Sequence, residues 1–139
     1  MNPNIWGPPT WEFLHSITLN YPVCPNEVQK NNIKNFFNNL QSILPCEKCQ
    51  LNYKQHLIKS PLTDQILSSR TTLIRWLFDI HNEVNISTGK KVITFEYFLE
   101  KYNRMYSGTS RYITPLNILI FFIVFVLIIL SLLYLFFRS

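Results

Sequence analysis

Two cysteines separated by two residues are the clearest source of chemistry in this sequence of 139 residues. Cys46 and Cys49 directly follow Pro45, and a proline suits the first position of a helix, so the pair is predicted to lie at a helix N-terminus. The positive end of the helix dipole and the adjacent Lys48 both favour a thiolate. The spacing therefore predicts a pair that forms and breaks a disulfide.

Other uses of the CxxC remain open on spacing alone. A zinc site needs four ligands, and the further candidates are Cys24, His15, His56 and His81, with no second CxxC in the sequence. A thioredoxin-like fold requires a βαβ pattern around the motif, and none is present. Two inert, buried cysteines are the third alternative.

A dithiol that becomes a disulfide must pass two electrons to an acceptor. The sequence has no second CxxC to receive them and no GxGxxG turn to hold a dinucleotide on a Rossmann fold. A cofactor is therefore predicted to lie among helices. Flat rings and polar groups recur at helical spacing that suits such a site: Trp11 with His15, and His81 with Asn85. Lys90 and Lys91 follow and could meet a pyrophosphate.

The elements that position these residues are predicted to be helical, because apolar residues recur at helical spacing and no long β-type alternation occurs. The fold class is all-α, a bundle of four or five helices. The helices are expected to begin at Thr10, after Pro25 with Asn26 as cap, at Cys46, near Ser69 and after Thr94. Inward-facing side chains are expected to include Ile33, Phe36, Phe37, Leu40 and Ile43, and later Phe95, Phe98, Leu99 and Tyr102.

Charge and composition limit the partners. The formal net charge is +5, from 13 Lys and Arg against 8 Asp and Glu, but the basic residues are scattered without a run of four. A nucleic-acid partner is therefore not predicted. Three cysteines are too few for a secreted disulfide scaffold.

The C-terminal part is expected to be a membrane anchor. Residues 116–137 carry no charge and are almost entirely Leu, Ile, Val and Phe, which predicts a transmembrane helix. Residues 107–115 are predicted to be a polar tether that follows a domain of residues 1–106. Basic residues before the anchor predict that the domain faces the cytoplasm.

Three separated motifs resemble the Erv/ALR sulfhydryl oxidases. They are Trp6-Gly7-Pro8-Pro9-Thr10-Trp11-Glu12-Phe13-Leu14-His15, Leu44-Pro45-Cys46-Glu47-Lys48-Cys49, and His81-Asn82-Glu83-Val84-Asn85 followed by Gly89-Lys90-Lys91. The resemblance covers about residues 6–106 and is greatest to the short members encoded by large cytoplasmic DNA viruses.

The resemblance implies a helical bundle that binds FAD and is often a homodimer. Cys49 resembles the cysteine beside the flavin, and Cys46 resembles the outward sulfur that exchanges with protein thiols or a shuttle dithiol. The implied flavin contacts are Gly7, Thr10, Trp11, His15, His81, Asn82, Val84, Asn85, Lys90 and Tyr102. Oxygen would be the final acceptor, with formation of hydrogen peroxide. The sequence departs from many relatives in lacking a second structural disulfide, where Ile58 and Phe95 stand, and a distal shuttle CxxC.

Two other functions compete with a thiol oxidase. One is a tail-anchored interaction module without enzymatic activity, in which the CxxC is incidental or binds metal. The other is a disulfide carrier without flavin that another protein oxidises. The presence of bound flavin and oxygen consumption would separate the oxidase from both.

Overall fold

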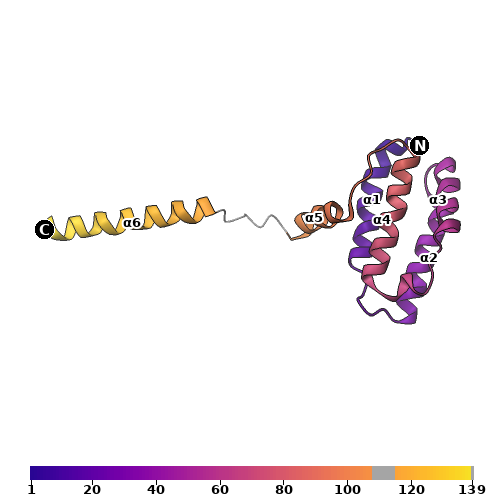
Figure 1. Cartoon of the computed structure of the whole chain (residues 1–139), viewed down its shortest axis with the longest axis horizontal. Coiled ribbons are helices and arrows are strands. Elements are labelled where there is room, and N and C mark those ends of the chain that lie inside the picture. Colours follow the sequence, from indigo (N-terminus) through magenta and orange to yellow (C-terminus); the bar gives the residue numbers. More distant parts are fainter. Residues whose placement is uncertain (108–114, 139) are drawn as a thin grey trace. The chain divides into compact units, whose positions relative to one another are not determined.

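Every element that the computed structural model describes is a helix, which confirms the predicted all-α class (Figure 1). The structure describes residues 1–107 and 115–138, and within the last helix it describes the side chains of 118–130, 134 and 136–138. The elements are α1 (Pro3–Leu19), α2 (Glu27–Ile43), α3 (Glu47–Lys59), the 3₁₀ turn η1 (Ile66–Ser68), α4 (Arg70–Ser87), α5 (Phe95–Tyr106) and α6 (Pro115–Arg138). The chain divides into two units, Met1–Tyr97 and Phe98–Ser139.

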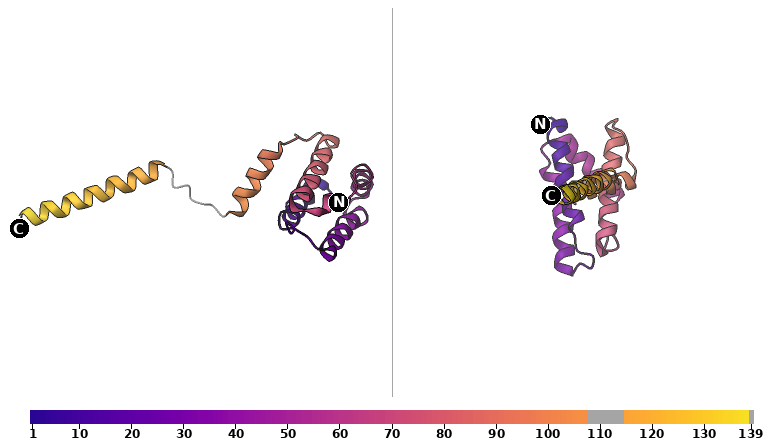
Figure 2. Two further views of the ribbon diagram at one scale, coloured as in Figure 1. Left: turned by 60° about the horizontal axis from the view of Figure 1, so that its bottom comes forward. Right: turned by 90° about the vertical axis from the view of Figure 1, so that its left-hand side faces the viewer.

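The first unit is built from two helix pairs. Helix α1 packs against α4, and α2 packs against α3, while η1 contacts both α2 and α4 (Figures 1 and 2). Apolar side chains from all of these elements form one core: Leu14, Tyr21, Phe37, Leu40, Tyr53, Leu62, Leu67, Leu73, Trp76, Leu77 and Ile80. Burial of these side chains is the main force that holds the helices together.

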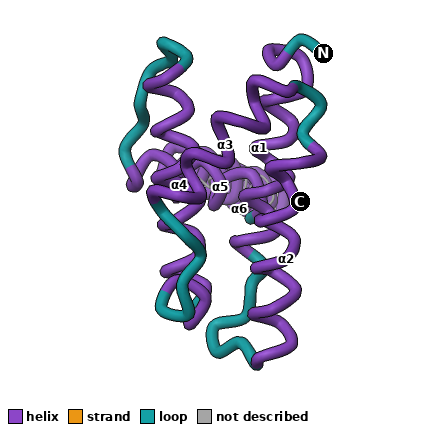
Figure 3. Tube along the Cα trace, turned by 90° about the vertical axis from the view of Figure 1, so that its right-hand side faces the viewer, coloured by secondary structure: helices purple, strands orange, loops and turns teal. Residues whose placement is uncertain are grey.

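Short connections join the helices at the ends of the first unit (Figure 3). Buried polar side chains fasten these connections to the core. The hydroxyl of Tyr21 donates to the carbonyl of Leu67 at 2.9 Å, and Trp76 Nε1 donates to the carbonyl of Ser60 at 2.8 Å. Each of these bonds satisfies a polar atom that would otherwise be buried at a cost in free energy.

Helix α1 begins earlier than the predicted Thr10. It includes Pro8 and Pro9, although proline removes a backbone donor from a helix interior. The extra turns begin at the N-cap Asn2, whose side chain accepts from the amide of Asn4 at 3.0 Å, and Pro3 occupies the first helical position. The cap at Asn2 therefore moves the start of the helix seven residues upstream, from Thr10 to Pro3.

Helices α2 and α4 begin close to where the sequence predicts. Asn26 and Gln29 form a reciprocal capping box at the start of α2, and Ser69 caps α4 through the amide of Thr72. The predicted inner stripe of α2 holds for the buried Phe37 and Leu40, but Ile43 is 65% exposed. The buried face of α2 ends at Leu40, because the helix itself ends at Ile43 and no further turn packs beside the Ile43 side chain.

The second unit contains most of α5 and all of α6. Phe98 and Tyr102 are buried, as predicted, and their ring centroids lie 4.8 Å apart. Leu99, which was also expected to face inward, is 41% exposed. Consecutive residues of an α-helix are about 100° apart around the helix axis, so Leu99 lies outside the face that carries Phe98 and Tyr102.

The expectation of a transmembrane helix over residues 116–137 is contradicted. Crossing a bilayer requires about 20 consecutive apolar residues in one helix. Among the residues that the structure describes, no helix combines the length and the apolarity that a membrane span needs. Most of the predicted tether, residues 108–114, lies outside the described residues.

Candidate functional site

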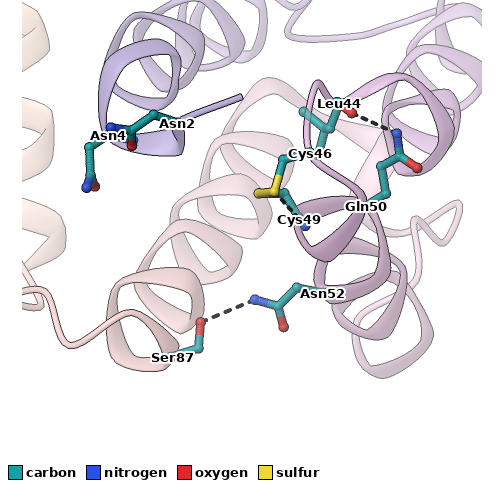
Figure 4. Close-up of a disulfide and its surroundings, with 8 residues drawn as sticks. All are labelled: Asn2, Asn4, Leu44, Cys46, Cys49, Gln50, Asn52 and Ser87. Carbon is teal, nitrogen blue, oxygen red and sulfur yellow. Dashed lines mark hydrogen bonds between the residues drawn. A yellow bond between two sulfur atoms is a disulfide. The ribbon is translucent and has the colours of Figure 1, made fainter.

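The CxxC lies at the N-terminus of α3, as predicted, and its two cysteines form a disulfide (Figure 4). Their Cα atoms are 5.1 Å apart. Cys46 is the N-cap residue, and its sulfur accepts a hydrogen bond from the backbone amide of Cys49 at 3.3 Å. The first turn of α3 therefore directs its partial positive charge at the sulfur atoms, which favours their thiolate form after reduction.

The turn before α3 is fixed by the carbonyl of Leu44. It accepts from the amide of Cys46 at 2.8 Å and from Gln50 Nε2 at 2.7 Å, and Figure 4 shows the second of these bonds. Both bonds hold the chain on each side of Pro45 and restrain where Cys46 lies. Sequence reasoning did not identify Gln50, although a side-chain amide four residues after an N-cap can reach back over the first turn.

Cys49 shares a face of α3 with two buried side chains. Tyr53 and His56 follow it by four and seven residues, and both are buried. The hydroxyl of Tyr53 donates to the carbonyl of Phe37 on α2 at 3.1 Å, and burial raises the pKa of this phenol far above its ordinary value. Cys49 therefore lies on the side of α3 that faces the interior of the unit.

Helix α3 also contacts the last turns of α4. Asn52 Nδ2 donates to the hydroxyl of Ser87 at 3.4 Å, beside the disulfide (Figure 4). Trp76, eleven residues before Ser87, bonds to Ser60, eight residues after Asn52, so α3 and α4 run antiparallel. His81 is six residues before Ser87, which is roughly 9 Å along the helix axis at 1.5 Å per residue.

Three aromatic side chains from α1 and α4 form the group that the sequence predicted. The rings of Trp11 and His81 stack with centroids 4.0 Å apart and planes 7° apart. His15 is fully buried, and its Nε2 lies 2.9 Å from His81 Nδ1, a hydrogen bond between the two imidazoles. The two predicted motifs, 66 residues apart in sequence, are thus brought into direct contact.

Other predicted residues of the first motif have more local roles. The hydroxyl of Thr10 donates to the carbonyl of Trp6 at 2.8 Å. Gly7 is half-buried, and a Cβ added there would meet no atom within 4 Å. The structure therefore shows no close backbone approach that would require glycine at this position.

The second motif extends into the segment after α4. Asn85 is buried, and its carbonyl accepts from the amide of Lys90 at 2.8 Å. The side-chain amide of Asn82 bonds to the backbone of Ile93. Val84 is half-buried, and Lys90 is exposed.

Tyr102 belongs to the second unit, so its predicted contact with the flavin remains a prediction. Within residues 1–107 and 115–138, no three His, Cys, Asp or Glu side chains gather into a cluster that could hold a metal ion.

The polar and aromatic groups of the first unit fit an FAD molecule. The ring group of Trp11, His15 and His81 supplies flat faces, and Lys90 supplies a cation for a diphosphate. Two buried nitrogens, Trp6 Nε1 and His56 Nε2, have no hydrogen-bond partner among the residues that the structure describes. Buried polar atoms are normally satisfied, so these nitrogens are available to a bound molecule.

Comparisons with known proteins agree with this site. A sequence model described as the Erv1 / Alr family matches residues 8–104. The chain is 48% identical over 100 residues to a probable FAD-linked sulfhydryl oxidase of Acanthamoeba polyphaga mimivirus, covering 72% of this chain and 70% of the relative. It is 30% identical over 107 residues to an FAD-linked sulfhydryl oxidase of African swine fever virus, covering 77% of this chain and 87% of the relative.

The fold agrees as well. The chain superposes on the FAD-binding domain of Erv1 from Saccharomyces cerevisiae with a TM-score of 0.67 and 28% identity, covering 73% of this chain and 93% of that domain. The family match covers most of the chain and includes the CxxC and both ring-bearing motifs. The chain therefore belongs to the Erv1/Alr family.

Proposed function

We propose that this chain forms disulfides in protein substrates through Cys46 and Cys49, as part of a cytoplasmic disulfide-forming pathway of a large DNA virus. The chain is a flavin-linked thiol oxidase, and its cofactor is FAD. The observation that carries the proposed route is the Cys46–Cys49 disulfide at the N-terminus of α3. The viral relatives support the proposed pathway.

The reaction begins with disulfide exchange. A substrate thiolate attacks Cys46 Sγ, the bond between Cys46 and Cys49 breaks, and its electron pair remains on Cys49 as a thiolate. The second substrate thiolate then displaces Cys46 and completes the substrate disulfide. The enzyme dithiol now holds the electron pair, and the N-terminus of α3 stabilises its negative charge.

FAD, when bound, accepts the electron pair from the dithiol and transfers it to oxygen, which yields hydrogen peroxide. Each turnover consumes two substrate thiols and one molecule of O2, and it forms one disulfide and one molecule of hydrogen peroxide. Cys49 is the proposed donor because it lies on the inward face of α3 with Tyr53 and His56. Cys46 is the proposed exchange sulfur because it lies before the helix, next to the exposed Pro45.

The cofactor contacts are proposed from the same geometry. The stacked rings of Trp11 and His81, with His15 behind them, would hold the flat parts of FAD. Lys90 would face the diphosphate. Gly7, Thr10, Val84 and Asn85 lie on the helices around these rings and are proposed as supporting contacts.

We also propose that the enzyme is a homodimer. Phe13 on α1 is 58% exposed and meets Phe36 on α2 edge to face, with ring centroids 6.5 Å apart. The exposed ring of Phe13, supported by the half-buried ring of Phe36, suits a self-complementary interface.

The test is visible absorption and oxygen uptake by the purified full chain with dithiothreitol. The oxidase is expected to be yellow and to consume oxygen, and Cys49→Ser should reduce turnover by more than about 100-fold while FAD is retained. Cys24→Ser is the matched control, since Cys24 is a free, exposed thiol outside the disulfide, and it should keep full turnover.

Full turnover in Cys49→Ser would contradict the assigned role of Cys49. A colourless protein that still exchanges disulfides with dithiothreitol would indicate the flavin-free carrier instead. A colourless protein without exchange would indicate an interaction module.

A further inference from the structure

The segment after α4 turns back along the helix and presents two lysines. Gly89 adopts φ +68°, the left-handed conformation that ends a helix, and Lys90 N–H donates to the carbonyl of Asn85 at 2.8 Å. Lys90 and Lys91 are exposed, and neither forms an ion pair within the part of the chain that the structure describes. Their ammonium groups are therefore available to an anion.

Asn82 holds the other end of this segment. Its Nδ2 donates to the carbonyl of Ile93 at 3.0 Å, and its Oδ1 accepts from the amide of Ile93 at 3.3 Å. The side-chain amide thus pairs with one residue in both directions, as a peptide group does in a strand ladder. This pairing uses one of the two lone pairs of Asn82 Oδ1 and one of the two N–H groups of Nδ2.

A second attachment follows two residues later. The ring of Phe95 packs edge to face on Phe78, with centroids 5.1 Å apart. The guanidinium of Arg75 lies 5.0 Å from the Phe95 centroid and is paired with Asp79 at 3.0 Å. With Lys90 N–H bonded to Asn85 and Ile93 bonded to Asn82, only residues 91 and 92 lie between the two backbone attachments.

We propose that Asn82 is a positioning residue, which does not touch FAD but pairs with Ile93 to fix the segment that carries Lys90 and Lys91 toward the FAD diphosphate. The inference rests on the proposed function, since it requires FAD at this site. It assigns Asn82 a different role from the direct flavin contact that its motif implied. A segment held in place before binding loses less conformational entropy when the ligand arrives, so the pairing raises affinity.

The test combines amide hydrogen exchange with FAD binding. In Asn82→Ala, the Ile93 amide of the FAD-free protein should exchange faster than in the wild type, and the dissociation constant for FAD should rise about tenfold, as expected for two lost neutral hydrogen bonds. Alanine is a better helix former than asparagine, so a loss would not arise from α4 itself. Asn82→Asp is the second variant: it retains an acceptor for the Ile93 amide and should show intermediate protection.

Lys90→Ala provides the discriminating control. If Asn82 acts through the lysine segment, removing Lys90 should weaken FAD binding much less in the Asn82→Ala background than in the wild type. The proposal would be overturned if the two substitutions raised the dissociation constant for FAD by factors that simply multiply in the double variant. Such independence would indicate a direct contact between Asn82 and FAD. The proposal would also be overturned if the Ile93 amide exchanged at the same rate in FAD-free Asn82→Ala as in the FAD-free wild type.

The two proposals fail in different ways. A wild-type protein that binds no FAD would overturn the proposed function, and this inference with it. Normal FAD binding by both the wild type and Asn82→Ala would overturn only the positioning role.

Discussion

His56 shows how a single buried side chain can make the stability of this protein depend on pH. The residue is 7% exposed, and within the described part of the chain its Nε2 has no hydrogen-bond partner. Burial lowers the pKa of His56 below its ordinary 6.5, with the nearby Lys59 acting in the same direction and Glu83 in the opposite one. The folded protein therefore resists protonation of this imidazole, whereas the unfolded chain accepts the proton.

The sign of the effect follows from this difference. Well above pH 6.5 the imidazole is neutral in both states and does not affect the free energy of unfolding. As the pH falls below 6.5, the unfolded state gains the proton first, so the free energy of unfolding decreases until the pH passes the folded pKa. We expect His56→Leu to lose less stability than the wild type on acidification, measured by urea unfolding of the FAD-free proteins at several pH values. The prediction would be contradicted if the free energy of unfolding fell equally with pH in His56→Leu and in the wild type.

At the scale of residues, sequence reasoning identified the chemistry but not the local bonding. The CxxC position and the Trp11, His15 and His81 group followed from motif spacing, because helical periodicity fixes which residues share a face. The pairing of Asn82 with Ile93 did not follow, because it depends on how the segment after Gly89 folds back, and tertiary packing sets that path.

The helices depend on side-chain caps at their N-termini. Asn2, Asn26, Cys46 and Ser69 each accept a hydrogen bond from a backbone amide in the first turn of the helix that follows. These bonds satisfy amides that lack a partner within the helix. At this scale the sequence predicted the cap of α2 and the approximate start of α4, which lie directly before clear apolar periodicity. It missed the cap of α1, because Pro8 and Pro9 are strong signals for a later start.

The capping box of α2 gives a prediction for stability. Asn26→Ala removes the acceptor for the amide of Gln29, and we expect a loss of about 1 kcal/mol in the free energy of unfolding. Asn26→Asp retains an acceptor and should remain within a few tenths of a kcal/mol of the wild type. Urea unfolding at neutral pH measures both variants. Equal stability of Asn26→Ala and the wild type would show that the cap contributes nothing.

At the scale of the whole molecule, the core and the cofactor must supply the stability. The described disulfide closes only the Cys46–Cys49 loop, with a sequence separation of 3, so it constrains little of the unfolded chain. The sequence predicted the all-α class and the bundle, because four helices carry strong periodic signals. The expected membrane span over residues 116–137 is contradicted, because no helix among the described residues combines the length and the apolarity that a span needs.

FAD should therefore raise the thermal stability measurably. A ligand that binds only the folded state at 100 times its dissociation constant adds about 2.7 kcal/mol to the free energy of unfolding. We expect the melting temperature of FAD-depleted protein to rise with added FAD, and to rise less with riboflavin, which lacks the diphosphate that Lys90 would face. A melting temperature independent of FAD concentration would be inconsistent with a cofactor held inside the folded domain.

The backbone amide of Cys49 donates to Cys46 Sγ while the two cysteines are joined in the disulfide. The acceptor is the same sulfur that would change bonding partner during each turnover, and a thiolate, a mixed disulfide and an intramolecular disulfide differ in electron density at that atom. The nitrogen nucleus of Cys49 is thus a natural reporter of turnover, and selective isotopic labelling of cysteine would allow each covalent state to be recorded from the backbone without a dye.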